Sequence, residues 1–457
     1  MTGRPMIEGD ERPMTTALPE QPIGAGELAL ATAELDRFPL PYAFALSQAR
    51  MTGAARRAMA GTWRAFAEGV DAFVAGLGRS VPRMAEALRL PEHLVPLWEA
   101  APEQQWALIA RPDVIVDRGA PKIVDVNAGS TAGLFAVNDL LLRTHRDPRL
   151  LPCFAAAERP RFVMGRYADL LRRYLTREDD LIAISFYAWE SEQPDHPDSG
   201  LWYYTALARE LGRLGLTADL VHAEDLEETA DGIVAHGRRV GLVLRIFLPD
   251  VGRPDEVAEY FRIVAATRRR GVTFLTSPWG EYLGTKATLA ALSDERFTDG
   301  LPPGLAARLG RAIPWTRVLE ERRTVWRGDS VDLPRWALEK REDLVLKPAL
   351  GGRGKGVLIG RETGPAEWAA EIDEALADDG VPWLLQELVR PDHERVAYLD
   401  AEGRYTVMDA PAVYGAFVLD GEFAGALRRH GLHGERKLMI NGPSGAIPSP
   451  VYWSDRD

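Results

Sequence analysis

Two groups of residues with the chemistry of a nucleotide site stand far apart in the sequence. Asp113 in RPDVIV is followed by Asp125 and Asn127 in IVDVNAGST, and these hard oxygen ligands suit Mg²⁺. Far downstream, Lys347 opens the stretch KPALGGRGKG, in which backbone amides can approach phosphate oxygens while lysine acts as a point charge on them. Together the two groups predict a site for ATP and Mg²⁺.

The glycine-rich stretch lies between two apolar runs, LVL and VLIG. Its glycines and basic residues are Gly351, Gly352, Arg353, Gly354, Lys355 and Gly356. It is not a Walker A motif, because no GK followed by Ser or Thr ends it and no helix follows it. The alternative is a flexible surface turn. The basic residues around the glycines favour a strand–loop–strand cover over phosphates instead.

The carboxylates precede this loop and lie in a predicted hairpin. Asp and Asn at turns often only cap or bend the backbone. In WALIARPDVIVDRGAPKIVDVNA, however, β-branched and polar residues alternate on either side of a turn at Asp117 to Pro121. The hairpin would place Asp113 and Asp125 on neighbouring strands facing the same side. Arg111 would share that face, where a guanidinium can neutralise a transferred phosphoryl group or an oxyanion.

The patterns around these motifs predict a mixed α+β and α/β fold in four parts. Residues 1–27 lack the apolar core of a signal peptide and are expected to form a flexible tail. Residues 28–160 are expected to hold packed helices and the metal-ligand strands, and residues 161–280 an α/β domain with a parallel sheet. Residues 281–457 are expected to hold an ATP-binding lid and C-terminal strands, with hairpins in ERVAYLDAEGRYTVM and YGAFVLDGEFAGAL.

Composition argues against several classes of protein. Lys plus Arg is 55 against 67 for Asp plus Glu, and the basic residues are scattered, which disfavours nucleic-acid binding. The apolar runs are too short to span a membrane. The single cysteine, Cys153, cannot form an internal disulfide, so a cytoplasmic location and a buried structural thiol are expected.

The ordered set of motifs resembles the circularly permuted ATP-grasp ligases, the group that contains glutathionylspermidine synthase. The set runs R-x-D, D-x-N after a turn, KPxxGGRGKG, LLQELV and GAFVLDGEFAGALRRHG, and covers roughly residues 105–140 and 275–455. Ordinary ATP-grasp enzymes carry the lysine and glycine loop first, so the order is inverted here. The resemblance implies a permuted ATP-grasp fold with an N-terminal helical segment and an inserted α/β domain of the pre-ATP-grasp kind at residues 161–280.

The resemblance also implies roles for the charged residues. Arg111 and Arg429 match arginines that hold the γ-phosphate and then the acylphosphate or tetrahedral intermediate, with Arg428 as the alternative to Arg429 by one residue of register. The residues that match the metal ligands are Asp113, Asp125 and Asn127.

The implied nucleotide contacts lie in the second half of the chain. Lys286 in LGTKATLAAL and Lys347 would bind the α- and β-phosphates, although a helix lysine such as Lys286 is most often solvated. The glycine-rich loop would close over the phosphates. An adenine hinge would be formed by Gln386, Glu387 and Val389.

Two departures from the family limit what the resemblance implies about substrates. The family often has glutamate where Asp125 stands, although aspartate remains a competent ligand, and its NADTPT motif is NAGSTAG here. The second change falls at Ser130 and Thr131, where a substrate would lie, so glutathione and spermidine are not expected. His430 and His433 are expected to be polar groups of a loop without a catalytic role.

The reaction implied by the resemblance joins a carboxylate to an amine through an acylphosphate, with release of ADP and phosphate. The expected substrates are a small-molecule carboxylate and an amine or peptide, with no nucleic-acid or membrane partner, and the oligomeric state stays open. One alternative is a kinase or phosphotransferase that uses the same site without an amine. Another is a nucleotide-binding protein with a decayed site, which the retained lysines, glycine loop and Asp–Asp–Asn set disfavour.

Overall fold

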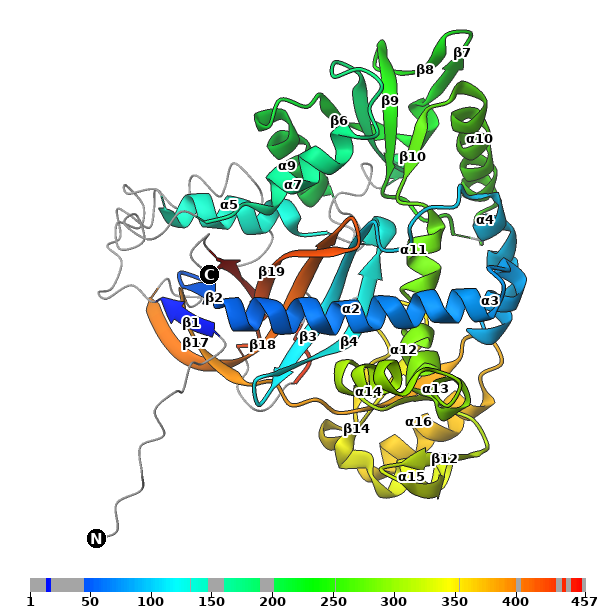
Figure 1. Ribbon diagram of the computed structural model, residues 1–457, viewed down its shortest axis with the longest axis vertical. Helices are drawn as coiled ribbons and strands as arrows, with labels where there is room; N and C mark the ends of the chain where they lie inside the picture. The colour runs from blue at the N-terminus through cyan, green and yellow to red at the C-terminus, as the bar shows by residue number, and fades with distance from the viewer. Residues whose placement is uncertain are drawn as a thin grey trace.

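Three sheets stacked along the long axis of the molecule carry the fold of this computed structural model (Figure 1). The largest sheet lies in the middle of the view, a mostly parallel sheet lies above it and a small antiparallel sheet lies below it. The structure describes residues 14–17, 45–131, 133–146, 160–189, 201–250, 252–352, 354–399, 404–432, 438–440 and 445–453. Cys153, for which a buried thiol was predicted, lies outside these residues.

The largest sheet joins segments from both ends of the chain. Its order is β1-β2-β20-β19-β18-β3-β4, with β17 also paired to β18, and only the β2–β20 pair in it is parallel among the described residues. Residues 14–17, within the predicted tail, form β1 in this sheet. Its strands are β1 Met14–Ala17, β2 Gln48–Met51, β3 Ile109–Asp117, β4 Ala120–Ala128, β17 His393–Leu399, β18 Tyr405–Leu419, β19 Glu422–His430 and β20 Ile447–Tyr452.

The predicted hairpins of this sheet are confirmed. Strands β3 and β4 are joined by Arg118 and Gly119, whose φ angles are 50° and 77°. Strands β18 and β19 are joined by Asp420 and Gly421, with φ angles of 56° and 75°. Two consecutive residues with positive φ match the right-handed twist of the flanking strands, and glycine in the second position adopts such a φ without strain.

Helices cover the largest sheet. Figure 1 shows α2 (Gly53–Gly76) crossing in front of β3, β4 and β18. It buries Trp63 and Phe66, and Trp63 Nε1 donates to the carbonyl of Gly421, 2.7 Å away. From α5 (Phe135–Arg146), Phe135 packs on Phe417 of β18 with ring centroids 4.7 Å apart. The other helices of this region are α3 Val81–Ala87, α4 Val95–Ala100 and α7 Val163–Arg172.

The upper sheet confirms the predicted α/β pattern. Its order is β6-β5-β9-β8-β7 with β10 beside β9, and β5 pairs in parallel with β6 and β9, as β10 does with β9. The β7–β8 hairpin is antiparallel and was not predicted. The elements are β5 Leu181–Phe186, α9 Leu201–Arg213, β6 Ala218–His222, β7 Glu227–Thr229, β8 Gly232–Ala235, β9 Arg238–Arg245, α10 Pro254–Arg270 and β10 Thr273–Leu275.

The lower sheet carries the glycine-rich loop. Its order is β11-β16-β14-β15, all antiparallel, and the loop connects β14 to β15 as predicted. Trp315, Trp326 and Trp336 pack together beneath it, with ring centroids 4.6 to 5.0 Å apart. The strands of this sheet are β11 Thr316–Val318, β14 Leu344–Pro348, β15 Leu358–Ile359 and β16 Trp383–Glu387. Strands β12 Arg323–Trp326 and β13 Asp329–Asp332 form a separate antiparallel pair.

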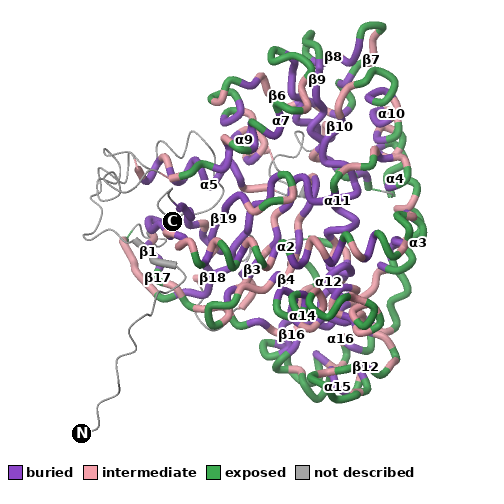
Figure 2. The backbone as a smooth tube through the Cα atoms, in the orientation of Figure 1, coloured by how far each residue is buried: buried purple, intermediate pink, exposed green. Residues whose placement is uncertain are grey.

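Helices α11 and α12 connect the upper sheet to the lower one along the end of β4 (Figure 1). Figure 2 shows buried residues concentrated in the sheets and inner helices, and exposed residues on the outer turns. Over the described part of the chain, no helix combines the length and apolarity needed to cross a bilayer. The remaining helices are α11 Pro278–Leu283, α12 Lys286–Ser293, α13 Glu295–Thr298, α14 Pro303–Ala312, α15 Leu333–Glu339 and α16 Pro365–Ala377, and the short 3₁₀ turns are η1 Glu92–Leu94, η2 Gly129–Thr131, η3 Ala223–Asp225, η4 Arg341–Asp343 and η5 Gly360–Glu362.

Candidate active site

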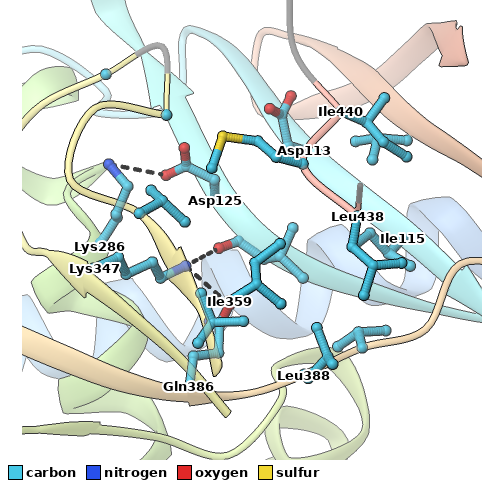
Figure 3. Close-up of a pocket in the computed structure, with 18 of the residues that line it drawn as sticks. Asp113, Ile115, Asp125, Lys286, Lys347, Ile359, Gln386, Leu388, Leu438 and Ile440 are labelled. Carbon is cyan, nitrogen blue, oxygen red and sulfur yellow. Dashed lines mark hydrogen bonds and ion pairs between the residues drawn. The ribbon is translucent and has the colours of Figure 1, made fainter. Parts of the chain in front are cut away.

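A pocket between the largest sheet and the lower sheet brings the two sequence motifs together (Figure 3). One end is polar and the other is apolar. The charged side chains that line the polar end are Asp113, Asp125, Lys286 and Lys347, and the glycine loop contributes Gly351, Gly352, Gly354 and Lys355. Arg353 lies outside the described residues, and Gly356 is not among the residues that line the pocket.

Strand register sets the positions of the carboxylates. Asp113 pairs directly with Asp125, and Arg111 pairs directly with Asn127. Directly opposed residues of an antiparallel pair point to the same face, so the prediction that the two carboxylates share a face is confirmed. Asn127 Nδ2 donates to the carbonyl of Arg111 over 3.3 Å, which ties its side chain to β3.

Gly415 of β18 makes room for the Arg111 side chain. It pairs with Asp113 from the other side, and a Cβ at Gly415 would lie 2.9 Å from Cδ of Arg111. Arg111 Nη1 donates to the carbonyl of Gly133 over 3.3 Å, and its Nε lies 3.6 Å from Asp113 Oδ1. The arginine is therefore held across the sheet surface, with its head next to the first carboxylate.

The structure separates Arg429 from Arg428. Arg429 pairs with Val413 on the site face, and its Nη2 lies 2.7 Å from Asp113 Oδ1. Arg428 lies on the opposite face, fully buried, where it forms an ion pair with Glu394 and donates to Ser449 Oγ over 2.9 Å. Alternation along β19 therefore places Arg429 at the site.

The two arginines control the charge of Asp113. Burial by itself would raise the pKa of Asp113, but the charges of Arg429 and Arg111 outweigh it and hold the pKa below its ordinary value. Burial lowers the pKa of Arg111, opposed mainly by Asp113. Asp113 is consequently an ionised carboxylate at neutral pH.

Lys347 is buried and its amine has neutral partners. Its Nζ donates to the carbonyl of Val124 over 2.7 Å and to Gln386 Oε1 over 2.9 Å. Burial lowers the pKa of Lys347 to about 8, although Asp125 opposes the shift. Gln386 Nε2 donates to Thr316 Oγ1 over 3.1 Å, so the Gln386 side chain orients the lysine and is not free to bind a base.

Lys286 begins α12 and points into the pocket (Figure 3). Its Nζ donates to the carbonyl of Gly351 over 2.7 Å and lies 3.6 Å from Asp125 Oδ1. The residue is buried, in contrast to a solvated helix lysine. It therefore links the glycine loop to the second carboxylate.

The apolar end of the pocket was largely missed by the sequence reasoning. Leu388 follows Glu387 in the predicted hinge, and both line the pocket with Val389. The backbone N–H of Glu387 donates to Trp315 and that of Leu388 to Asp343, each over 2.8 Å, which fixes the hinge. The other apolar lining residues are Ile115, Val124, Val345, Val357, Ile359, Val413, Leu438, Met439 and Ile440.

Some of these walls had a sequence signal. Ile115 stands two residues after Asp113, and Val413 two residues before Gly415, so strand alternation places each on the site side. The wall formed by Leu438, Met439 and Ile440 had none, because it comes from the connection between β19 and β20. The result is a slot with apolar sides and a backbone edge, which suits a planar base.

The residues proposed for substrate contacts lie differently from expectation. The backbone N–H of Ser130 donates to Glu281 Oε1 over 2.6 Å, and its hydroxyl donates to the same oxygen. Arg245, fully buried, donates to that oxygen from Nη2 over 2.6 Å. Ser130 is thus engaged by a buried ion pair. The side chain of Thr131 lies outside what the structure describes.

The loop assignment of His430 was wrong. His430 ends β19 and is fully buried, and burial lowers its pKa well below the ordinary value, so it is neutral. The hairpin extends one residue beyond Arg429 because His430 still pairs with Ala412. His433 lies outside the described residues.

The donor set fits a divalent cation shared with a polyphosphate. No group of three or more His, Cys, Asp or Glu side chains within the described residues is placed to hold a metal alone. Asp113 and Asp125 supply two opposed carboxylates with Asn127 beside them. Mg²⁺ commonly takes one or two carboxylates and completes its shell with phosphate oxygens and water, so this set is sufficient for it.

The fold around this site is ATP-grasp-like. The chain is similar to a glutathione synthetase-like effector from Globodera pallida, with 12% identity, 95% of this chain and 99% of that chain covered, and a TM-score of 0.55. It also matches a γ-glutamylcysteine synthetase-like protein from Methylobacillus flagellatus (12% identity, 81% and 84% covered, TM-score 0.41). A third match is the ATP-grasp ligase PsnB in complex with a precursor peptide and AMPPNP (16% identity, 51% and 84% covered, TM-score 0.26). No protein-family model and no curated protein sequence matches the chain.

Proposed function

We propose that this chain is an ATP-dependent ligase that joins a carboxylate to an amine. The observation that carries the proposal is the pocket itself, in which an apolar slot opens directly onto two carboxylates and two buried lysines. Two arginines lie against the first carboxylate. The ATP-grasp-like fold and the order of the motifs, with the carboxylates before the glycine loop, support a circularly permuted member of that class.

The base of ATP would lie in the apolar slot. Val389 follows the hinge strand, and its backbone N–H has no hydrogen-bond partner among the described residues, so a base edge can bind it. The phosphates would extend toward Lys347 and Lys286, with the amides of the glycine loop above them. Asp113, Asp125 and Asn127 would hold Mg²⁺, which supplies neutralisation of phosphate charge when bound.

Arg111 and Arg429 would act on the reacting groups. In the proposed reaction an oxygen of the substrate carboxylate bonds to the γ-phosphorus of ATP as the bond to ADP breaks, giving an acylphosphate. The amine then bonds to the carbonyl carbon and phosphate leaves, with the amine proton lost to solvent. Two guanidiniums fixed beside the carboxylate hairpin are placed to neutralise the charge that spreads over the phosphoryl and tetrahedral oxygens.

A coupled ADP-release screen tests the proposal. Carboxylates from amino acids to peptides are offered with ATP and Mg²⁺, each with and without an amine, and hydroxylamine is added in parallel to trap an acylphosphate as a hydroxamate. ADP release that needs the carboxylate, with hydroxamate formed in its presence, is the expected result. A stable phosphorylated product formed without an amine would identify a phosphotransferase instead.

A further inference from the structure

The charges at the polar end of the pocket are already paired with one another. Asp125 Oδ1 lies 3.6 Å from Lys286 Nζ, and Asp113 Oδ1 lies 2.7 Å from Arg429 Nη2. Each of the two proposed carboxylate ligands is therefore held by a cation that is itself proposed to bind phosphate. Figure 3 shows the first of these pairs as a dashed line between Lys286 and Asp125.

These pairs are shielded enough for their charges to matter. The side chains of Lys286 and Arg429 are 10% and 13% exposed, and those of Asp125 and Asp113 are 30% and 17% exposed. Separating charges at such depth is unfavourable unless both partners are compensated, because each then loses its neighbour without regaining full hydration. A ligand that takes only one partner of each pair leaves the other uncompensated.

A polyphosphate without metal, or a metal ion without polyphosphate, would take only one partner of each ion pair. Phosphate oxygens that take Lys286 and Arg429 leave Asp125 without its lysine and Asp113 with Arg111 alone, both beside a polyanion. A divalent cation that takes Asp125 and Asp113 leaves two positive side chains beside it. The metal–polyphosphate complex gives every charged group a new partner in one binding event. The carboxylates bind the cation, while the lysine and the arginine bind the phosphates.

We propose that the pocket selects the metal–nucleotide complex against the free nucleotide, and that Asp125 sets this selectivity by holding Lys286. The inference rests on the proposed nucleotide site and goes beyond it, because it assigns the carboxylate a role before any metal is bound. Lys347 has no such role, since its partners are the neutral oxygens of Val124 and Gln386.

Asp125→Asn tests the assignment with little change of shape. Asparagine keeps an oxygen to accept from the N–H of Val126, which Asp125 Oδ1 does over 3.0 Å. The dissociation constant of ADP is measured by calorimetry with Mg²⁺ and again with EDTA. Removing the negative charge is expected to tighten metal-free ADP binding by about tenfold or more and to shrink the enhancement by Mg²⁺ by a similar factor.

Two controls accompany the variant. Lys347→Met is expected to weaken ADP binding by a similar factor with and without Mg²⁺, so the ratio between the two conditions is unchanged. Asp117→Asn removes a carboxylate of the same hairpin that pairs with exposed Arg118 and lies outside the pocket, and it is expected to change neither value. Circular dichroism and thermal unfolding verify each fold, and Asp125→Ser replaces Asp125→Asn if that variant does not fold.

The outcomes separate the inference from the proposed function. Metal-free ADP binding that is unchanged or weaker in a folded Asp125 variant, while wild type binds Mg-ADP, overturns the inference and leaves the nucleotide site in place. A wild-type protein that binds ADP in neither condition overturns the proposed function together with the inference.

Discussion

The Nζ atom of Lys286 lies between the carbonyl of Gly351 at 2.7 Å and Oδ1 of Asp125 at 3.6 Å. One amine thus contacts the glycine loop of the lower sheet and a strand of the largest sheet. Helix α11, which leads into the helix of Lys286, is held at the end of β4 by close packing, since a Cβ at Gly280 would lie 2.8 Å from the backbone nitrogen of Gly129. The position of the lysine relative to the carboxylates is therefore set by backbone contact.

Asp125→Ala is expected to lower ATP-dependent turnover by at least about a hundredfold, because the pocket loses one of two opposed carboxylates. The fold should change little, since Lys286 Nζ still donates to the carbonyl of Gly351 when the carboxylate is removed. ADP release and thermal unfolding measure the two effects. Asp117→Ala, at the end of the partner strand β3, serves as the matched control and should keep wild-type turnover. Retained turnover in Asp125→Ala would contradict the metal assignment.

The pH dependence of nucleotide binding should report Lys347. Its pKa of about 8 means that the free protein loses this positive charge as the pH rises through that value. ADP affinity is therefore expected to fall between about pH 7 and about pH 9.5 in wild type. In Lys347→Arg the charge persists, because the arginine pKa is above about 12, and this step should disappear. A wild-type affinity that stays constant over this range would contradict a phosphate contact by Lys347.

The contribution of Lys347 to the free energy of unfolding should change with pH in the direction opposite to ADP affinity. The pKa of Lys347 is lowered on folding from an unfolded value near about 10.4, so the unfolded chain binds more protons between about pH 8 and about pH 10. The contribution of Lys347 to the free energy of unfolding consequently rises with pH over that window. Denaturant unfolding of wild type and Lys347→Met, compared at each pH, isolates this contribution. A difference between them that does not change with pH would contradict it.

Strand alternation explains which parts of the site could be predicted from sequence. Asp113 and Asp125 were placed on one face because a two-residue turn fixes the register of their hairpin. The choice between Arg428 and Arg429 needed the pairing of β18 with both β3 and β19, which joins segments some three hundred residues apart. Local pattern carries no information about such a register.

The polar side chains that are taken up by distant partners could not be predicted for a related reason. Ser130 donates to Glu281 and Gln386 accepts from Lys347, and in each case the partner comes from a distant element. A buried polar group needs a partner, but the sequence does not say which one the packing supplies. Glu281 is itself held by Arg245 of the upper sheet. The position of the loop after β4 thus depends on the upper sheet, which contains none of the motifs found in the sequence.

Gly415→Ala should disable the site through Arg111. The added methyl would lie 2.9 Å from Cδ of Arg111, so the arginine must leave its place beside Asp113. We expect turnover to fall at least about tenfold and the free energy of unfolding to fall by about 1 to 3 kcal/mol. Gly61→Ala in α2 is the control, because a Cβ there meets nothing within 4 Å and alanine favours a helix by about 0.5 to 1 kcal/mol. Full activity in Gly415→Ala would show that turnover does not require Arg111 at its position beside Asp113.

Arg428 and Arg429 are neighbours with opposite expected effects. Arg429→Met should lower turnover by at least about a hundredfold, because it removes a guanidinium from the reacting face. It should destabilise the protein little, since Asp113 keeps Arg111 at 3.6 Å.

Arg428→Met should instead lower the free energy of unfolding by about 3 kcal/mol, because Glu394 loses its buried partner on the other face. The fraction that remains folded should keep most of its turnover, as Arg428 lies on the face of β19 opposite to the site. Denaturant unfolding and ADP release, compared at equal folded fraction, separate the two arginines. A loss of turnover confined to Arg428→Met would reverse the assignment and, with it, the register of β19 against β18.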